Sequence, residues 1–324
     1  MAELRWHPLT RDWVMIASHR QNRPQMPKNW CPFCPGSGKV PHEYTVYQYD
    51  NDFPALSTDP PAPDETGGGI YRTAESYGRC EVVLYSPDHH ATLPALSDEH
   101  MQKLVDLWVE RTRVLSGDPR IKYVFVFENR GEMVGVTMPH PHGQIYGYPF
   151  IPKKIQLETE ACREHYESSG GCLICEMVAE EKRFGHRVIF ENESFIVFLP
   201  FFCEYPYGVY IVPKQHIQAL PDMNETMRRS FGITVRDTVG MLDELFGIPF
   251  PYMMCMHQSP VNSGDFGSYY HFHVEFFPPM RSAEKQKFNA SSETGVWAHC
   301  NPTAPEEKAE ELRRAYAGYL SKKG

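Results

Sequence analysis

The 324-residue chain alternates short apolar runs with two longer amphipathic segments. Runs at 80–85, 123–127, 195–198, 209–212 and 252–256 have the length and the β-branched or aromatic content of strands. Two segments repeat apolar residues at spacings of three and four, which predicts helices from near Ser97 and from about Glu225 to Phe246. We expect core faces made of Met101, Leu104, Val105 and Trp108 in the first helix, and Met227, Phe231, Val235, Thr238, Leu242 and Leu245 in the second.

The two ends of the chain carry simpler signals. Residues 6–16 read as a turn followed by a strand, and residues 57–70, rich in proline and glycine, as a loop. Thr303 and Glu306 have the spacing of a capping box, which predicts a terminal helix from Glu306 to Leu320.

The order of motifs recurs between the two halves. Each half has a Cys-x-x-Cys, a strand with a histidine at its end, a helix, another strand and a His-x-His. This recurrence predicts an internal duplication. We expect an α+β fold of two similar units, residues 1–160 and 161–324. Each would be an antiparallel sheet with helices packed on one face, either separate or merged into one long sheet.

Composition and net charge limit the classes of function that the chain can have. With 41% apolar and 13% aromatic residues the chain can bury a large core. The formal charge of −9 argues against a broad nucleic-acid-binding surface, whereas a pocket for an anionic metabolite needs only a few local cations.

Location follows from the absence of sorting signals. No apolar run reaches bilayer length, and the first residues lack the zones of a signal peptide, so we expect a cytoplasmic protein without a membrane partner. Nine cysteines in a reducing compartment read as thiols or metal ligands rather than as disulfides.

Each half offers four ligands for tetrahedral zinc: two cysteines, a strand-end histidine and one histidine of the His-x-His. A redox pair is the rival reading of a lone Cys-x-x-Cys, but no βαβ pattern surrounds the first one. Counting from the preceding proline, by analogy with His216, keeps His90 as an alternative to His89. The two predicted sites are Cys31, Cys34, His89 and His140, and Cys172, Cys175, His216 and His271.

The segment 138–146 carries the candidate chemistry. In extended backbone His140 and His142 point to the same side, and the intervening prolines favour that geometry. If His140 binds metal, His142 is left as a neutral imidazole whose second nitrogen can attack phosphorus. Gly143 permits close approach of a substrate to the backbone, and Gln144 adds an uncharged donor. His273, the counterpart of His142, is not followed by Gly-Gln, so we expect the second unit to keep the architecture without the chemistry.

Two further cations remain open to two readings. Arg20 and Arg23 lie three residues apart without an obvious acidic partner nearby in the sequence. They are either solvated surface charge or a phosphate clamp that uses the forked donors of arginine.

Several motifs together carry a family resemblance. They are His-Pro-His-Gly-Gln at 140–144, Phe-Glu-Asn at 127–129, Cys31-x-x-Cys34 and Ser-Pro-Asp-His at 86–89. This set, which spans nearly the whole chain, resembles the galactose-1-phosphate uridylyltransferase family of the histidine-triad superfamily. The resemblance implies a homodimeric nucleotidyltransferase built from a duplicated histidine-triad-like unit. It would exchange UMP between UDP-glucose and a hexose 1-phosphate, which is galactose 1-phosphate. The intermediate would be a uridylyl group bound covalently to His142.

The resemblance also implies substrate contacts. Arg20, Arg23, Asn51 and Asp52 would line the uridine diphosphate site, Asn129, Thr137 and Gln144 would contact phosphate or sugar, and Lys287 and Glu293 would lie near the hexose. Two positions depart from the family pattern. Thr137-Met138 replaces Ser-Asn, which keeps the hydroxyl and loses the amide, and Ser292 stands where an aromatic residue precedes Glu293, which bears on hexose choice.

The second metal has two candidate ligand sets, and its identity is zinc or iron. The family can use a glutamate and three histidines, matched here by Glu158, His257, His271 and His273. That set competes with the cysteines for His271, and we favour the cysteines because thiolates bind zinc strongly and the duplication predicts them.

Gln144 favours transfer over hydrolysis. Histidine-triad hydrolases have a third histidine at its position, which can protonate a poor leaving group, whereas a sugar phosphate leaves as a stable anion and needs no acid. Two alternatives remain: a related phosphorylase that moves adenylyl, and, in a different class, a zinc-dependent binding module.

Overall fold

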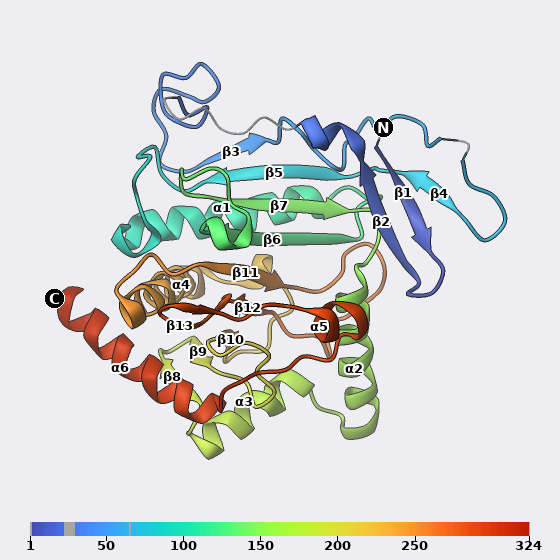
Figure 1. Ribbon diagram of the computed structural model, residues 1–324. Helices are drawn as coiled ribbons and strands as arrows, with labels where there is room; N and C mark the ends of the chain where they lie inside the picture. The colour runs from blue at the N-terminus through green and yellow to red at the C-terminus, as the bar shows by residue number, and fades with distance from the viewer. Residues whose placement is uncertain (1, 23–29, 65, 324) are drawn as a thin grey trace.

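The computed structural model describes residues 2–22, 30–64 and 66–323. Its main element is a nine-stranded antiparallel sheet in the order β3-β5-β7-β6-β11-β12-β10-β9-β8, which Figure 1 shows from top to bottom. The strands are β3 (Tyr47–Asp50), β5 (Arg79–Leu84), β6 (Tyr123–Arg130), β7 (His142–Tyr148), β8 (Val188–Glu191), β9 (Phe195–Phe198), β10 (Tyr210–Pro213), β11 (Tyr252–His257) and β12 (His273–Phe277).

The sheet consists of two copies of one strand arrangement. Read outward from its centre, the order is β6, β7, β5, β3 in one half and β11, β12, β10, β9 in the other. The halves join where β6 pairs with β11, with Glu128 opposite Met254. The expected fold class, a duplicated α+β unit with antiparallel pairing, is therefore confirmed, and the two sheets merge into one.

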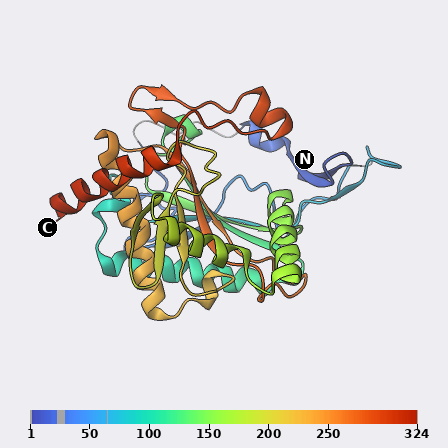
Figure 2. The same cartoon turned by 90° about the horizontal axis from the view of Figure 1, so that it is seen from below.

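Three helices cover one face of the sheet: α1 (Asp98–Ser116), α4 (Glu225–Phe246) and α6 (Pro305–Lys323). Figure 2 shows α1 and α4 together on one side. Helices α1 and α4 each begin at a capping side chain. Ser97 accepts a hydrogen bond from the His100 amide, and Asn224 accepts one from the Met227 amide. The apolar faces predicted from the periodicity are buried in the core between these helices and the sheet, with Leu245 only partly buried.

The terminal helix begins differently from the sequence prediction. It starts at Pro305, one residue before Glu306, and continues to Lys323 rather than ending at Leu320. The Thr303 hydroxyl donates to Asn301 Oδ1 at 2.8 Å. The predicted capping box was therefore wrong in its geometry, and proline at the first helical position favours the start instead.

The opposite face of the sheet is covered unevenly. In the C-terminal half α2 (Lys153–Ser169) and α3 (Leu173–Phe184) pack on it through Cys162, Ile174 and Val178. In the N-terminal half the loop around Cys31 and the first residues of the chain lie there. The smaller elements are β1 (Ala2–His7), β2 (Asp12–Ala17) and β4 (Thr73–Glu75) in one sheet, β13 (Met280–Ser282) with β14 (Lys285–Gln286), and α5 (Ser291–Val296). Four 3-10 helices are η1 (Ser18–Asn22), η2 (Leu93–Ala95), η3 (Glu132–Val134) and η4 (Leu220–Asp222).

Successive side chains of β7 point to opposite faces of the sheet, so the candidate catalytic residues lie on one face and the core residues on the other. Ile145 packs against the helices, so Gly143 faces them too, whereas His142, Gln144 and Tyr146 point to the other face.

Among the helices of the described residues, none combines the length and apolar character needed to cross a bilayer.

Candidate active site and metal centres

His142 opens strand β7, and its imidazole is oriented by the preceding histidine. Its Nδ1 lies 2.7 Å from the backbone oxygen of His140. A carbonyl oxygen only accepts, so Nδ1 carries the proton and Nε2 has the lone pair. The ring lies 6.0 Å from that of Phe33, in the Cys31 loop. The local backbone therefore selects the tautomer that a nucleophile requires.

The first ligand set comes together as a compact cluster. Cys31, Cys34, His89 and His140 have their potential ligand atoms within 4.8 Å of one another. Cys34 Sγ lies 3.5 Å from His89 Nδ1 and 3.7 Å from His140 Nδ1. Zinc bonds of about 2.3 Å to sulfur and about 2.0 Å to nitrogen place tetrahedral ligands about 3.5 Å apart. It is His89, and not His90, whose ring lies in this cluster.

The orientation of His140 fits a metal ligand. Its Nε2 donates to the Ser86 carbonyl oxygen at 2.8 Å, which leaves Nδ1 as the donor atom directed at the cysteines. Burial lowers the pKa of His140 to about 4, so the ring is neutral and able to coordinate. Donor type, spacing and tautomer together suit a tetrahedral zinc site.

The second set forms a matching cluster in the other half. Cys172, Cys175, His216 and His271 are grouped, with Cys175 Sγ 3.6 Å from His216 Nδ1 and 3.3 Å from His271 Nδ1. His216 Nε2 donates to the Gly267 carbonyl oxygen at 2.9 Å. The setting differs in one respect, because Cys172 is the N-cap of α3, whereas Cys31 lies in a turn.

The rival ligand set is divided. His271 lies with the cysteines, while Glu158, His257 and His273 gather with Glu275, which the sequence reasoning missed. His273 keeps the geometry of its counterpart, with Nδ1 3.0 Å from the His271 backbone oxygen. Its Nε2, however, lies 3.5 Å from Glu275 and 3.9 Å from Glu158. Burial would lower the pKa of His273, but these carboxylates raise it.

Lys154 adds a cation to this third cluster. Its Nζ lies 2.5 Å from Glu275 Oε2, and the Tyr210 hydroxyl donates to Glu275 Oε1 at 2.5 Å. Although burial opposes it, His257, His273 and Lys154 hold the pKa of Glu275 well below its usual value. Among the described residues His273, the equivalent of the nucleophile, is thus 4% exposed and enclosed by charged partners.

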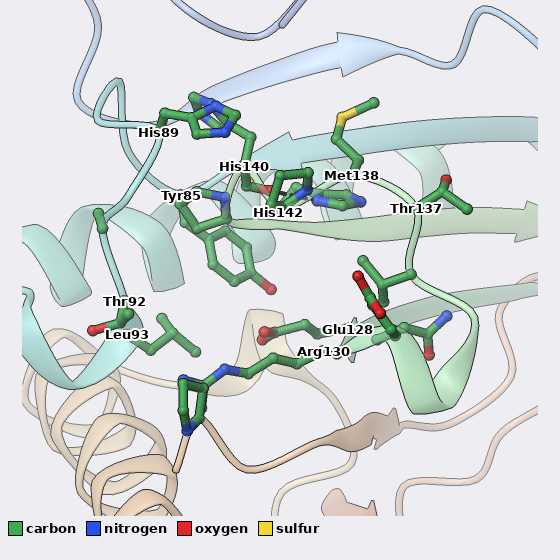
Figure 3. A pocket seen from close by; sticks show the side chains of 18 of the residues that line it. Tyr85, His89, Thr92, Leu93, Glu128, Arg130, Thr137, Met138, His140 and His142 are labelled. Atoms are coloured by element: carbon green, nitrogen blue, oxygen red, sulfur yellow. Dashed lines mark hydrogen bonds between the residues drawn. The ribbon is translucent and has the colours of Figure 1, made fainter. Parts of the chain in front are cut away.

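A cavity of about 730 Å³ lies beside the first unit's histidines. Figure 3 shows His142, His140 and Thr137 around it, with Glu128 and Arg130 on the far side. Asn129 also lines it. The structure therefore brings the predicted nucleophile His142 and two predicted substrate contacts, Asn129 and Thr137, to one cavity, which the predicted metal ligands His89 and His140 also line.

Gln144 and Arg20 approach the same face of β7 from outside that cavity. Gln144 Oε1 accepts a hydrogen bond of 3.1 Å from the Tyr146 hydroxyl, which orients its amide group. Burial raises the pKa of Tyr146, and the adjoining Arg20 side chain partly opposes that shift. Arg20 thus lies next to the residue that holds Gln144, whereas Arg23 is outside the described residues.

The remaining predicted contacts lie apart from the cavity. Asn51 and Asp52 follow β3, where Asp52 accepts a hydrogen bond of 2.8 Å from the Tyr49 hydroxyl. Lys287 and Glu293 are buried and pair with each other at 3.3 Å. Within the described chain these last two residues do not line the space beside His142.

Two residues that the sequence analysis passed over lie directly beneath the nucleophile strand. A Cβ at Gly143 would lie 2.2 Å from the Tyr85 hydroxyl oxygen and 3.1 Å from the Phe127 backbone oxygen. The close approach that requires glycine is therefore that of Tyr85, and not of a substrate as expected. Glu128 is 5% exposed and faces the same side. The signal in the sequence was a carboxylate in phase with the inward-facing Val124 and Val126.

Comparison with known proteins gives a consistent result. Residues 1–152 match the model of the galactose-1-phosphate uridyl transferase N-terminal domain, and residues 158–316 match that of the C-terminal domain. The chain is 43% identical to the galactose-1-phosphate uridylyltransferase of Thermotoga maritima, over 97% of this chain and 98% of that protein. A rat galactose-1-phosphate uridylyltransferase is 31% identical, over 96% of this chain and 86% of its own length.

Solved structures show the same architecture. A uridylyltransferase superposes with a TM-score of 0.91 at 31% identity, covering 98% of this chain and 99% of its own. An ADP-glucose phosphorylase from Arabidopsis thaliana, with bound ADP-glucose, superposes with a TM-score of 0.75 at 25% identity, over 97% and 99%.

Proposed function

The chain belongs to the galactose-1-phosphate uridylyltransferase family, and from that membership we propose how its own residues carry out the reaction. It is a nucleotidyltransferase that exchanges UMP between UDP-glucose and galactose 1-phosphate. The catalytic residues in this proposal are His142, as nucleophile, and Gln144, as a hydrogen-bond donor to the phosphoryl group.

In the first step His142 Nε2 attacks the α-phosphorus of UDP-glucose. A P–N bond forms, the P–O bond to glucose 1-phosphate breaks, and its electron pair leaves with that phosphate. The proton on Nδ1 stays hydrogen-bonded to the His140 carbonyl oxygen. This hydrogen bond stabilises the positive charge that develops on the ring. The Gln144 amide donates to a non-bridging oxygen as charge builds there.

In the second step a phosphate oxygen of galactose 1-phosphate attacks the uridylyl group. The P–N bond breaks, its electrons return to Nε2, and UDP-galactose leaves. Neither leaving group needs a proton, so an amide at position 144 is sufficient. An amide also cannot remove the proton that a water molecule must lose when it attacks the uridylyl group. This difference favours transfer over hydrolysis.

The metal sites have structural roles in this account. Cys31, Cys34, His89 and His140 would hold zinc, and Cys172, Cys175, His216 and His271 would hold zinc or iron, each ion acting as a cross-link between distant segments. The first cluster fixes the residue whose carbonyl orients His142. One half, residues 1–160, then carries the nucleophile, and the other, residues 161–324, retains the duplicated architecture.

Substrate contacts follow the same assignment. Arg20, Arg23, Asn51 and Asp52 bind the uridine diphosphate, and Asn129 and Thr137 contact phosphate or sugar. Lys287 and Glu293 act on the hexose, and since they lie away from the cavity of their own chain, they serve the active site of a partner in a homodimer. A cytoplasmic location is supported by the nine cysteines, all of them free thiols.

One observation carries the nucleophile assignment: the Nδ1 bond of His142 to the backbone of a residue in the first ligand cluster, beside a substrate-sized cavity. Product analysis with UDP-glucose and galactose 1-phosphate, with His142→Asn alongside, tests it. We expect glucose 1-phosphate and UDP-galactose from the wild type and neither from the variant. Uridylyl exchange by a folded, metal-loaded His142→Asn protein would refute the assignment.

A further inference from the structure

A row of buried polar side chains crosses the sheet beneath the nucleophile strand. It runs from Tyr85, which follows β5, through Glu128 on β6 to Tyr252 on β11. The Tyr252 hydroxyl donates to Glu128 Oε1 at 3.0 Å. All three side chains lie on the helix side of the sheet, opposite to the imidazole of His142. None of them takes a direct part in the reaction described above.

Tyr85 is held firmly against the His-Pro-His segment. Its backbone amide donates to the Pro141 carbonyl oxygen at 3.0 Å, and its carbonyl oxygen lies 2.6 Å from His100 Nε2. Trp108 packs edge-on against its ring, with a centroid distance of 6.0 Å. The ring therefore has little freedom to turn away from the strand above it.

The Tyr85 hydroxyl touches the backbone between the two catalytic residues. The position of a Cβ at Gly143 would overlap this hydroxyl at 2.2 Å and the ring carbon that bears it at 3.0 Å. Gly143 directly joins His142 to Gln144. A shift of the hydroxyl toward or away from the strand is consequently transmitted to both catalytic side chains.

Glu128 faces that hydroxyl from the next strand. Figure 3 shows the Tyr85 hydroxyl directed toward the Glu128 carboxylate, with His142 above. Burial and the Glu128 charge raise the pKa of Tyr85. Glu128 Oε2 is buried and, among the described residues, has no hydrogen-bond partner of its own. A buried carboxyl oxygen without a partner is costly, and strain of this kind gathers at functional sites.

We propose that Tyr85 and Glu128 are positioning residues for uridylyl transfer: Tyr85 supports Gly143 from below, and Glu128, anchored by Tyr252, restrains the Tyr85 hydroxyl. Together they set the position of His142 and Gln144 relative to the phosphorus. This inference rests on the proposed role of His142 as nucleophile. Both side chains also line the cavity beside His142, but Tyr85 is only 1% and Glu128 only 5% exposed. We therefore expect the pair to act through the backbone, on the chemical step, with little change in substrate affinity.

The test compares Tyr85→Phe, Glu128→Gln and Glu128→Leu in the full-length, metal-loaded protein. The readouts are the single-turnover rate of covalent labelling by UDP-glucose, kcat and KM for UDP-glucose, and thermal unfolding. Tyr123→Phe is the matched control, since Tyr123 is also a buried tyrosine whose hydroxyl lacks a partner among the described residues. His142→Asn reports on the chemistry itself.

We expect Tyr85→Phe to slow labelling and kcat by about tenfold to a hundredfold, with KM within about twofold of the wild type. Glu128→Leu should behave alike, and Glu128→Gln, which can still accept from Tyr252, should restore most of the rate. Should Glu128→Leu fail to fold, Tyr85→Phe and Glu128→Gln decide the matter.

Labelling by Tyr85→Phe at the wild-type rate would overturn the inference, as would an equal loss in Tyr123→Phe. A failure of the nucleophile assignment has a different signature, because His142→Asn would then still be labelled.

Discussion

The Nδ1 atom of His142 lies 2.7 Å from the backbone oxygen of His140, whose own ring lies among Cys31, Cys34 and His89. One hydrogen bond therefore connects a candidate nucleophile to a candidate metal site. The second unit repeats this bond between His273 and His271 but directs the other ring nitrogen at buried carboxylates. In our proposal, the same local backbone serves chemistry in one unit and architecture in the other.

Removing a cysteine from each metal cluster should have different effects. Cys31→Ala should lose the first ion, loosen His140, and slow labelling of His142 about tenfold to a hundredfold. Cys172→Ala should lose the second ion and lower the unfolding temperature, while labelling of the folded fraction continues at the wild-type rate. Elemental analysis, labelling kinetics and calorimetry on both variants measure this. Equal labelling rates in the two variants would contradict the separation of roles.

Replacing His273 should leave the transfer reaction in place. His273→Asn removes a buried ring that faces Glu158 and Glu275, so we expect the loss to appear in thermal stability. Labelling by UDP-glucose, corrected for the folded fraction, should match the wild type. If labelling disappeared in a folded His273→Asn protein, the second unit would have to take part in the chemistry.

Gln144→Ala should slow both half-reactions. The amide is oriented by Tyr146. In the proposed mechanism it donates to oxygens that gain charge in the transition state, and such a donor contributes about 2–4 kcal/mol. We therefore expect kcat to fall by a factor of about thirty to a thousand. Gln48→Ala, on β3, is the matched control, because among the described residues the Gln48 side chain donates to Asp50 at the surface. An increase in KM with kcat unchanged would instead indicate that Gln144 serves substrate binding.

The stability of the protein should depend on pH through Glu128. Burial raises the pKa of Glu128 from 4.5 to about 7. Because the folded pKa exceeds the unfolded one, the contribution to stability is complete below pH 4.5 and is lost as the pH rises to about 7. Glu128→Gln cannot ionise, so the unfolding free energy of the wild type should fall by about 3 kcal/mol relative to this variant across that window.

Chemical denaturation at several pH values measures this difference. The comparison with Glu128→Gln cancels the other titrating groups. A difference that stayed constant across the window would show that Glu128 does not titrate within it.

The sequence carried much of the architecture because the relevant signals are local. Cys-x-x-Cys, a histidine at a strand end and His-x-His recur in order, and that order was enough to predict the duplication. Capping residues Ser97 and Asn224 with apolar spacing defined the two long helices. The capping box predicted at Thr303 was wrong, because the last helix begins at Pro305 instead.

What the sequence did not reveal depends on contacts between strands. Glu275 lies two residues from His273 on β12, but His257 comes from β11, where it lies opposite His273, and Glu158 comes from α2. Tyr85 reaches Gly143 because Leu84 pairs with His142 across β5 and β7. Such partners require the register of the sheet, which no single segment encodes.

The central claim is that the imidazole of His142 carries the uridylyl group. Intact-mass analysis after mixing with UDP-glucose, without acceptor, tests it most directly, with His142→Asn and the exposed His90→Asn as a matched pair. The wild type and His90→Asn should gain the mass of one uridylyl group per chain, released on addition of galactose 1-phosphate, and His142→Asn should gain none. A uridylyl adduct on His142→Asn, or no adduct on an active wild-type protein, would contradict the account.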